Sequence, residues 1–237
     1  MWRALRTETL RLAALPGLRC IVLRGEGGHF CAGGNIAEYP DFRFDAAQLR
    51  HFHEDEVWGA LRALLDCDVP LLACIEGSCM GAGVEIASCC DIRIATSEAR
   101  FGAPIARLGF AMAPRELQLV LGQIGPTVAR SMLLEAETFD AARMQQCGLL
   151  TRLCSAEALE AELSRSTARI LALAPEAARA HKRMVRALAM GATGGDAALQ
   201  PLLAQAYDYA DSAEHREGIT AFLQKRSPAF ADIPPAS

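Results

Sequence analysis

The sequence has no long apolar run and no excess of positive charge. No segment stays apolar for the roughly 20 residues that a membrane-spanning helix requires, so we expect no membrane insertion. The 24 Lys and Arg residues face 28 Asp and Glu residues, and the net charge of −4 does not favour nucleic acid or an anionic membrane as a partner. A hydrophobic fraction of 51% over 237 residues excludes a disordered chain and allows a sizeable core.

The cysteines and the N-terminus both indicate a cytoplasmic protein. The nine cysteines form no C-x-x-C pair, and most stand among Val, Ile, Leu and Ala, where a reduced cysteine behaves as a small buried hydrophobic residue. Without paired cysteines we expect no zinc site either. Residues 1–12 carry three arginines among Leu and Ala and lack the continuous apolar core of a signal peptide, so they predict an amphipathic helix.

Strands alternate with helices in the first part of the chain, and helices alone follow. The predicted strands are 20–24, 71–75, 91–95 and 149–153, and the predicted helices are 1–14, 41–65, 84–89, 156–172 and one between Asp140 and Gly148. Another helix begins at Pro175, a flexible break is expected at Gly191–Gly195, and Asp211 with Glu214 has the spacing of a capping box for the last helix. The pattern predicts an α/β core, residues 1–172, and a helical C-terminal region, residues 173–237.

Two glycine-rich segments follow predicted strands. They are Gly27–Ile36, with the sequence GGHFCAGGNI, and Ile75–Glu85, with the sequence IEGSCMGAGVE. Loops of small residues expose backbone N–H groups, and the second loop leads into a helix, so both have the features of an oxyanion hole. Glu85 follows Ala82 by three residues, which places a carboxylate on the first turn of that helix. The two segments together predict activation of a carbonyl group beside a proton-transfer group.

These segments resemble motifs of a known family. The second, extended through Ile92, closely resembles the crotonase signature of enoyl-CoA hydratases and isomerases, and the first resembles the F-x-A-G-A-D-[IL] loop of the same family. Phe101–Pro104, Gly148–Leu149 and Glu217–Pro228 match further family motifs in the expected order. The resemblance therefore covers nearly the whole chain.

The resemblance implies a fold, a substrate and a set of site residues. The fold would be a crotonase-like spiral of β-β-α units with a helical C-terminal oligomerisation region, assembled as a homotrimer or a pair of trimers. The substrate would be an acyl-CoA thioester, with no separate cofactor because coenzyme A is part of the substrate. By motif, the N–H groups of Gly34 and Ala82 would hold the thioester oxygen, and Glu85 would be the catalytic acid/base. By the same comparison, the substrate-binding residues would be Gly34, Asn35, Ile36, Ala37, Ala82, Ile105 and Lys225.

Three departures from the family pattern bear on the activity. Asn35 stands where the family loop has Asp, and Ile105 stands where hydratases have their second catalytic glutamate. The chain also begins at the helix that follows, in the family, an N-R-P-x-x-x-N-A segment that cradles part of CoA. Either that segment is missing from the sequence or this subtype lacks it, and in the first case we expect the DNA upstream of Met1 to encode it.

Other candidate groups have simpler interpretations. Glu116 could replace the missing carboxylate, but it lies in a helical pattern and is expected to be solvated. His51 and His53 could bind a metal, but without a carboxylate or cysteine cluster nearby in the sequence we interpret them as a polar helix face. Ser78 lacks the surroundings of a nucleophile elbow, so a serine hydrolase is not favoured.

Two functions from different classes remain open. The first is an enzyme that transforms acyl-CoA through an enolate-like intermediate, where a single carboxylate favours a double-bond shift or a decarboxylation over hydration. The second is a degenerate homologue that binds acyl-CoA, or serves as an assembly partner, without efficient turnover. The acyl chain length and the choice among these reactions depend on pocket side chains, which only the fold brings together.

Overall fold

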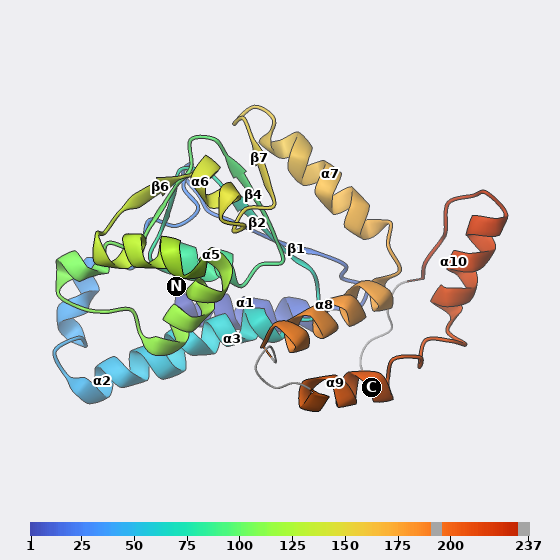
Figure 1. Cartoon of the computed structure of the whole chain (residues 1–237), viewed down its shortest axis with the longest axis horizontal. Coiled ribbons are helices and arrows are strands. Elements are labelled where there is room, and N and C mark those ends of the chain that lie inside the picture. Colours follow the sequence, from blue (N-terminus) through green and yellow to red (C-terminus); the bar gives the residue numbers. More distant parts are fainter. Residues whose placement is uncertain (191–195, 232–237) are drawn as a thin grey trace. The chain divides into compact units, whose positions relative to one another are not determined.

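Strands and helices alternate up to residue 154 and only helices follow, as the sequence predicts (Figure 1). The computed structural model describes residues 1–190 and 196–231. The chain divides into two compact units: Met1–Arg11, Val22–Cys67 and Leu71–Ser164 form the first, and Leu12–Ile21, Asp68–Pro70 and the residues from Arg165 onward form the second. Apart from Ile21, the strands belong to the first unit.

A four-stranded sheet of order β1-β2-β4-β7 lies at the core of the first unit. Its strands are Ile21–Arg24, Leu71–Ile75, Ile92–Thr96 and Arg152–Cys154. The β2–β4 and β4–β7 pairs are parallel, with Cys74 opposite Ile94 and Ala95 opposite Leu153. All five residues of β2 are apolar and buried, as is typical of a parallel strand covered on both faces.

A second sheet, of order β3-β5-β6, is not predicted by the sequence pattern. Its strands, Ser78–Met80, Arg100–Gly102 and Thr138–Asp140, have three residues each, too few to show a period of two. β3 pairs with β5 in parallel and β5 pairs with β6 antiparallel. This sheet positions the second glycine-rich segment, because β3 leads through Gly81 directly into α4 (Ala82–Ser88).

Most helices of the first unit match helices that the hydrophobic pattern predicts. Besides α4, this unit contains α1 (Trp2–Ala13), η1 (Ile36–Asp41), α2 (Ala46–His51), η2 (Phe52–Val57), α3 (Trp58–Asp66), η3 (Ile105–Leu108), α5 (Pro114–Leu134), α6 (Ala141–Gln146) and α7 (Leu159–Leu171), which ends in the second unit. The prediction of one α-helix over residues 41–65 is wrong at two points. The helix begins only after Asp45, whose side chain accepts a hydrogen bond from the Gln48 N–H at 2.8 Å, and η2 is a π-helix.

The second unit contains α8 (Pro175–Met190), α9 (Asp196–Ala204) and α10 (Ala213–Leu223). The capping prediction for α10 is wrong, because Ser212 and not Asp211 is the N-cap residue. Glu214 instead caps α8: its two carboxylate oxygens accept from the Glu176 N–H at 3.1 and 3.2 Å. The break expected at Gly191–Gly195 lies outside the described residues.

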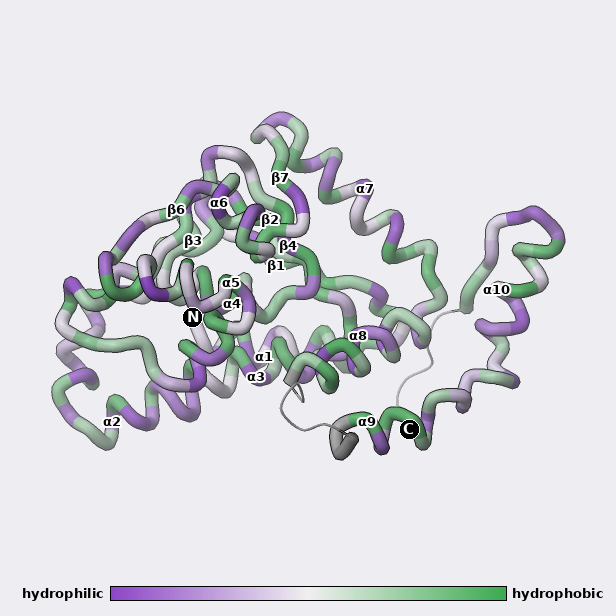
Figure 2. The backbone as a smooth tube through the Cα atoms, in the orientation of Figure 1, coloured by the Kyte–Doolittle hydropathy of each residue, from purple (hydrophilic) through white to green (hydrophobic). Residues whose placement is uncertain are grey.

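Apolar residues are distributed differently in the two units. Hydrophobic residues run through β2, whereas they alternate with hydrophilic ones along α7 and α10 (Figure 2). The second unit exposes many large apolar side chains, among them Val185, Leu188, Leu203, Tyr207, Phe222 and Leu223. Within the described residues, no helix has both the length and the apolar character needed to cross a membrane.

Candidate active site

Backbone hydrogen bonds join the two glycine-rich segments. Cys31 and Cys79 form an isolated parallel bridge. The Cys31 N–H donates to the Ser78 carbonyl with an N···O distance of 2.9 Å, and the Met80 N–H donates to the Cys31 carbonyl at 2.8 Å. Gly34 lies three residues beyond Cys31, and Ala82 lies three residues beyond Cys79. Because the bridge fixes the register between the two segments, Gly34 and Ala82 reach the wall of the same cavity.

The N–H groups of Gly34 and Ala82 are available to a ligand. Neither N–H donates a hydrogen bond to any of the described residues. Ala82 is the first residue of α4, where backbone N–H groups have no partner within the helix. Gly81, directly before it, has a φ of +49°, a left-handed conformation that favours glycine and that turns the chain from β3 into α4. Two unpaired donors on one cavity wall suit an oxygen that develops negative charge.

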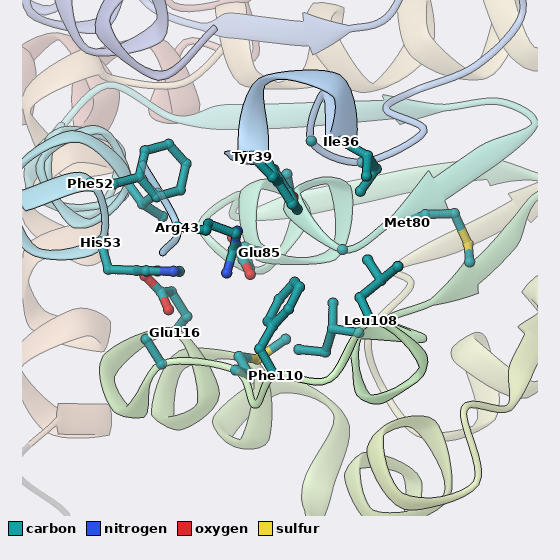
Figure 3. A pocket seen from close by; sticks show the side chains of 18 of the residues that line it. Ile36, Tyr39, Arg43, Phe52, His53, Met80, Glu85, Leu108, Phe110 and Glu116 are labelled. Atoms are coloured by element: carbon teal, nitrogen blue, oxygen red, sulfur yellow. The ribbon is translucent and has the colours of Figure 1, made fainter. Parts of the chain in front are cut away.

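The cavity has a volume of about 370 Å³, which lies in the range of small-molecule sites (Figure 3). Most of its wall is apolar or aromatic, with contributions from Trp2, Ile36, Tyr39, Phe52, Met80, Leu108 and Phe110. Besides Tyr39, the titratable residues in the wall are Arg43, His53, Glu85, Arg107 and Glu116. The arrangement suits a largely apolar ligand that is held by apolar contacts and reacts at a few polar groups.

Glu85 lies on the first turn of α4 and is half-buried in the cavity wall. Burial and, to a smaller extent, the negative charge of Glu116 raise its pKa from 4.5 to about 8, and the positive charge of Arg43 opposes this shift. Glu85 therefore holds its proton through most of the neutral range. A carboxyl group with a pKa close to the working pH can both donate and accept a proton during a reaction.

Glu116 and His53 form a pair in the same wall. Glu116 lies in the first turn of α5 and is only 2% exposed. Its Oε1 is 3.1 Å from His53 Nδ1, and its Oε2 is buried without a hydrogen-bond partner among the described residues. The expectation that Glu116 is solvated is wrong. So is the interpretation of His53 as part of a polar face, since its side chain is 20% exposed and turns toward Glu116.

The sequence contained a signal for Glu116 but none for His53. Glu116 stands four residues before Val120 and eight before Ile124, and all three lie on the buried face of α5. This spacing marks Glu116 as a residue that faces inward. His53 lies in the π-helix η2 (Phe52–Val57), whose turns are wider than those of an α-helix, so the helical period does not give its direction.

Arg43 is a third group that the sequence does not predict. Its guanidinium carbon lies 4.2 Å from the centre of the Tyr39 ring and 3.8 Å from the centre of the Phe110 ring, within the range of cation–π contact. Its Nε is buried and has no hydrogen-bond partner among the described residues. Figure 3 shows Arg43 directly beside Glu85. The Tyr39 and Phe110 rings thus hold the positive charge of Arg43 next to Glu85, where this charge opposes the rise in the pKa of Glu85.

The structure brings most of the expected site residues together. Gly34, Ile36, Ala82, Glu85 and Ile105 line the cavity. Asn35 and Ala37 are neighbours of these residues in the first glycine-rich segment and in η1 but do not line the cavity. Lys225 follows α10 in the second unit, where its backbone is left-handed with a φ of +55°.

Asn35 stabilises the start of η1. Its Oδ1 accepts a hydrogen bond from the Ala37 N–H at 3.3 Å, and its Nδ2 donates to Glu38 Oε1 at 2.8 Å. An Asp at this position would keep the first bond and lose the second, because a carboxylate has no N–H to donate. The departure from Asp at position 35 therefore matches the presence of Glu38.

No group of three or more His, Cys, Asp and Glu residues in the described part of the chain has the arrangement of a metal site. His51 pairs with Asp55, with 2.8 Å between Nδ1 and Oδ2, while His53 turns to Glu116. The two histidines thus point to different partners. None of the nine cysteines, all of which lie within the described residues, is in a disulfide.

Comparisons with known proteins identify relatives over most of the chain. A family model described as enoyl-CoA hydratase/isomerase matches residues 10–233. The 2,3-dehydroadipyl-CoA hydratase of Escherichia coli is 32% identical over 213 residues, which cover 88% of this chain and 79% of that protein. The cyclohexa-1,5-dienecarbonyl-CoA hydratase of Thauera aromatica is 32% identical over 219 residues, covering 90% of this chain and 79% of that protein.

A solved structure has the same fold. The enoyl-CoA hydratase/carnithine racemase from Magnetospirillum magneticum matches with a TM-score of 0.90 and 33% identity, covering 98% of this chain and 85% of that one. The expected crotonase-like fold class is confirmed. The family model and the relatives, taken together, show that the chain belongs to the enoyl-CoA hydratase/isomerase family.

Proposed function

We propose that the protein transforms an acyl-CoA thioester, with the N–H groups of Gly34 and Ala82 holding the thioester oxygen and Glu85 moving a proton beside it. The observation that carries this proposal is that two unpaired N–H groups and a carboxyl group with a pKa raised to about 8 line one cavity. A thioester oxygen that gains negative charge requires donors of this kind, and the loss of one donor typically slows a reaction by about 10²–10³.

Glu85 supplies the proton transfer in this proposal. Removal of a proton from the carbon next to the thioester leaves an enolate, whose charge rests on the oxygen that Gly34 and Ala82 hold. The carboxylate form of Glu85 removes the proton, and the protonated form returns it. The raised pKa of Glu85 brings its basicity closer to that of the carbon acid, which lowers the barrier to transfer.

The names of the relatives support the same substrate class. One relative is a hydratase of 2,3-dehydroadipyl-CoA and another is a hydratase of cyclohexa-1,5-dienecarbonyl-CoA. We therefore propose an unsaturated acyl-CoA as the substrate of this chain. Coenzyme A is part of that substrate and no separate cofactor is needed. Lys225 is proposed to contact a phosphate of CoA.

Exchange of the α-hydrogen tests the proposal most directly. In D₂O, the enzyme is expected to exchange the α-hydrogen of butyryl-CoA, measured by mass spectrometry, and Glu85→Gln is expected to slow this exchange by about 10²–10⁴. Binding of butyryl-CoA, measured by calorimetry, should survive because backbone groups hold the thioester. Glu54→Gln removes an exposed carboxylate from η2 and serves as the matched control. Equal exchange by the wild type and Glu85→Gln would contradict the proposal.

One observation favours a second function, the binding of acyl-CoA without efficient turnover. Ile105, which replaces the second glutamate expected of a hydratase, lines the cavity with an apolar side chain. Under this alternative, crotonyl-CoA raises the unfolding temperature of the wild type, yet no α-hydrogen exchanges and no enoyl-CoA is consumed. The thermal shift followed by the exchange assay distinguishes the two functions.

We also propose that the protein forms a homotrimer or a pair of trimers in the cytoplasm. The exposed apolar side chains of α8, α9 and α10 support this proposal, since Phe222 is 81% exposed and Leu223 is 74% exposed. Apolar patches of this kind usually mark an interface. Sedimentation at micromolar concentration tests the assembly, and a stable monomer would contradict it.

A further inference from the structure

The cavity holds a second carboxyl group that the proposed function does not use. Glu116 is almost completely buried, its Oε1 is 3.1 Å from His53 Nδ1, and its Oε2 has no partner among the described residues. Buried polar atoms in proteins are nearly always hydrogen-bonded, and an exception needs a reason such as catalysis or a bound molecule. A carboxylate oxygen held without a partner in the wall of a ligand-sized cavity is such an exception.

Glu85 and Glu116 reach the cavity from different elements. Glu85 comes from α4 and Glu116 from α5, while His53 comes from η2. In Figure 3, His53 and Glu116 lie against one another, with Glu85 and Arg43 beside them. The charge of Glu116 also contributes to the raised pKa of Glu85, so the two carboxyl groups lie within electrostatic range of each other.

We propose that Glu116, positioned by His53, is the second acid/base group of this cavity and activates the water molecule that adds to an enoyl-CoA. This inference rests on the proposed function and assigns hydration as the reaction of that site. Glu116 thereby supplies, from α5, the carboxyl group that position 105 at the start of η3 lacks.

Hydration gives the two carboxyl groups different tasks. The carboxylate of Glu116 takes a proton from water while the water oxygen forms a bond to the β-carbon. The electron pair of the double bond moves toward the thioester oxygen, which the N–H groups of Gly34 and Ala82 hold. Glu85 then donates its proton to the α-carbon as the enolate collapses. Solvent returns the proton from Glu116 to Glu85, so one water molecule is added and both groups recover their starting states.

His53 is a positioning residue in this scheme. The Nδ1–H tautomer donates to Oε1 of Glu116, which leaves Oε2 as the oxygen that meets water. The π-helix η2 sets the direction of the imidazole, and π-helical turns are frequent at functional sites. His53 therefore acts through Glu116 and not on the substrate.

Two assays on the same variants separate the roles. We expect Glu116→Gln to lower kcat for hydration of crotonyl-CoA, followed by the absorbance of the conjugated thioester, by about 10²–10⁴. The same variant should retain α-hydrogen exchange with butyryl-CoA, because Glu85 and the two N–H groups are intact. Glu85→Gln should lose both reactions, and the control Glu54→Gln should retain both.

Variants of His53 test the positioning role. We expect His53→Leu to lower kcat for hydration with little change in KM, because the Glu116 carboxylate loses the donor that orients it. His53→Asn should recover kcat, since its Nδ2 occupies about the place of the imidazole Nδ1. If Glu116→Gln does not fold, Glu116→Asp keeps the charge and withdraws it by one methylene, and it should lose hydration while retaining exchange.

Several outcomes would overturn the inference. One is equal hydration by the wild type and Glu116→Gln. Another is a wild type that exchanges the α-hydrogen but hydrates no enoyl-CoA, which leaves the proposed function standing. A third is an equal loss of exchange and hydration in Glu116→Gln, because Glu116 would then act only through Glu85. A wild type that does neither reaction contradicts the proposed function itself.

Discussion

The two sides of the cavity are built by different means. The loop side presents the backbone N–H groups of Gly34 and Ala82. Its geometry depends on the backbone hydrogen bonds that join the two glycine-rich segments. The helix side presents the side chains of His53 and Glu116, which are 63 residues apart in the sequence. The backbone donors are the same whatever side chains surround them, whereas the helix side changes with single substitutions. The loop side therefore suits a function common to many substrates, and the helix side suits the choice of reaction.

Among changes on the loop side, removal of one backbone donor is expected to have the largest effect, and it tests whether this side works through its N–H groups. Ala82→Pro deletes the N–H at the first position of α4, where proline is compatible with helical geometry; Pro114 and Pro175 already begin α5 and α8. We expect α-hydrogen exchange to fall by about 10²–10³ or more, since the proline ring also occupies space at the cavity wall. Mass spectrometry in D₂O measures the rate.

Ala141→Pro is the matched control for this variant. Ala141 is the first residue of α6 and does not line the cavity. Both variants are expected to keep the far-ultraviolet circular dichroism of the wild type, and only Ala82→Pro is expected to lose exchange. A folded Ala82→Pro protein that exchanges at the wild-type rate would show that the oxygen is held elsewhere.

The same contrast explains how much of the site the sequence predicts. The segments around Gly34 and Ala82 can be identified because their function depends on local backbone geometry, which requires small residues at fixed spacing. β2 is also predicted, since its apolar run is long enough to show burial. The strands of the second sheet escape prediction because three residues carry no readable period.

The helix side could be predicted only in part. The four-residue spacing from Glu116 to Val120 indicates that Glu116 faces inward, but it names no partner. The contact with His53 depends on a π-helical turn and on the packing of distant segments, which no local pattern encodes. The stacking of Arg43 between two rings is tertiary in the same way.

A second prediction concerns the pH dependence of the free energy of unfolding, which reports on the carboxyl group of Glu85. The pKa of Glu85 is raised from 4.5 to about 8 in the folded protein, so the folded state keeps a proton that the unfolded state releases. The stabilisation by this proton is complete below about pH 4.5 and is lost as the pH rises through about 8, with a slope of up to about 1.4 kcal/mol per pH unit between these values.

Glu85→Gln removes this titration. We expect the free energy of unfolding of Glu85→Gln, measured with urea between pH 5 and pH 8, to increase relative to that of the wild type as the pH rises, because only the wild type loses the stabilisation by this proton. Glu54→Gln, which alters an exposed carboxylate, should follow the wild-type curve. Parallel curves for the wild type and Glu85→Gln would mean that Glu85 is not desolvated in the folded protein.

A third, smaller effect is expected from Arg43. Its positive charge lowers the pKa of Glu85, against the burial and the charge of Glu116 that raise it, while His53 faces Glu116 from η2. Arg43→Met should therefore raise the pKa of Glu85. In a plot of the α-hydrogen exchange rate against pH, the limb that reports the carboxylate form of Glu85 should move to higher pH. At pH 7 we expect the rate of exchange to fall by less than about tenfold, since the charge of Arg43 is the weakest of the three influences on the pKa of Glu85.

Arg107→Met sharpens the assignment of this effect. Arg107 also lines the cavity, but it does not contribute to the pKa of Glu85. Removal of its charge should leave the position of the limb unchanged, even where it alters KM. A limb that moves equally in both variants would indicate a general loss of positive charge and not a contact between Arg43 and Glu85.

The smallest effect is expected at Asn35, and it tests whether the loop side tolerates local exchange of side chains. Asn35→Asp loses the 2.8 Å bond from Nδ2 to Glu38 and sets two carboxylates against each other at the start of η1. Both side chains are exposed, so the cost in unfolding free energy should be about 0.5–1 kcal/mol and should shrink as salt is added. The double variant Asn35→Asp/Glu38→Gln restores a donor and an acceptor with their places exchanged, and it should regain the wild-type unfolding temperature.

Exchange of the α-hydrogen should stay near the wild-type rate in both variants, because Asn35 does not line the cavity and the Gly34 N–H is a backbone group. A double variant no more stable than Asn35→Asp would show that the amide at position 35 is needed for a contact other than the one with Glu38.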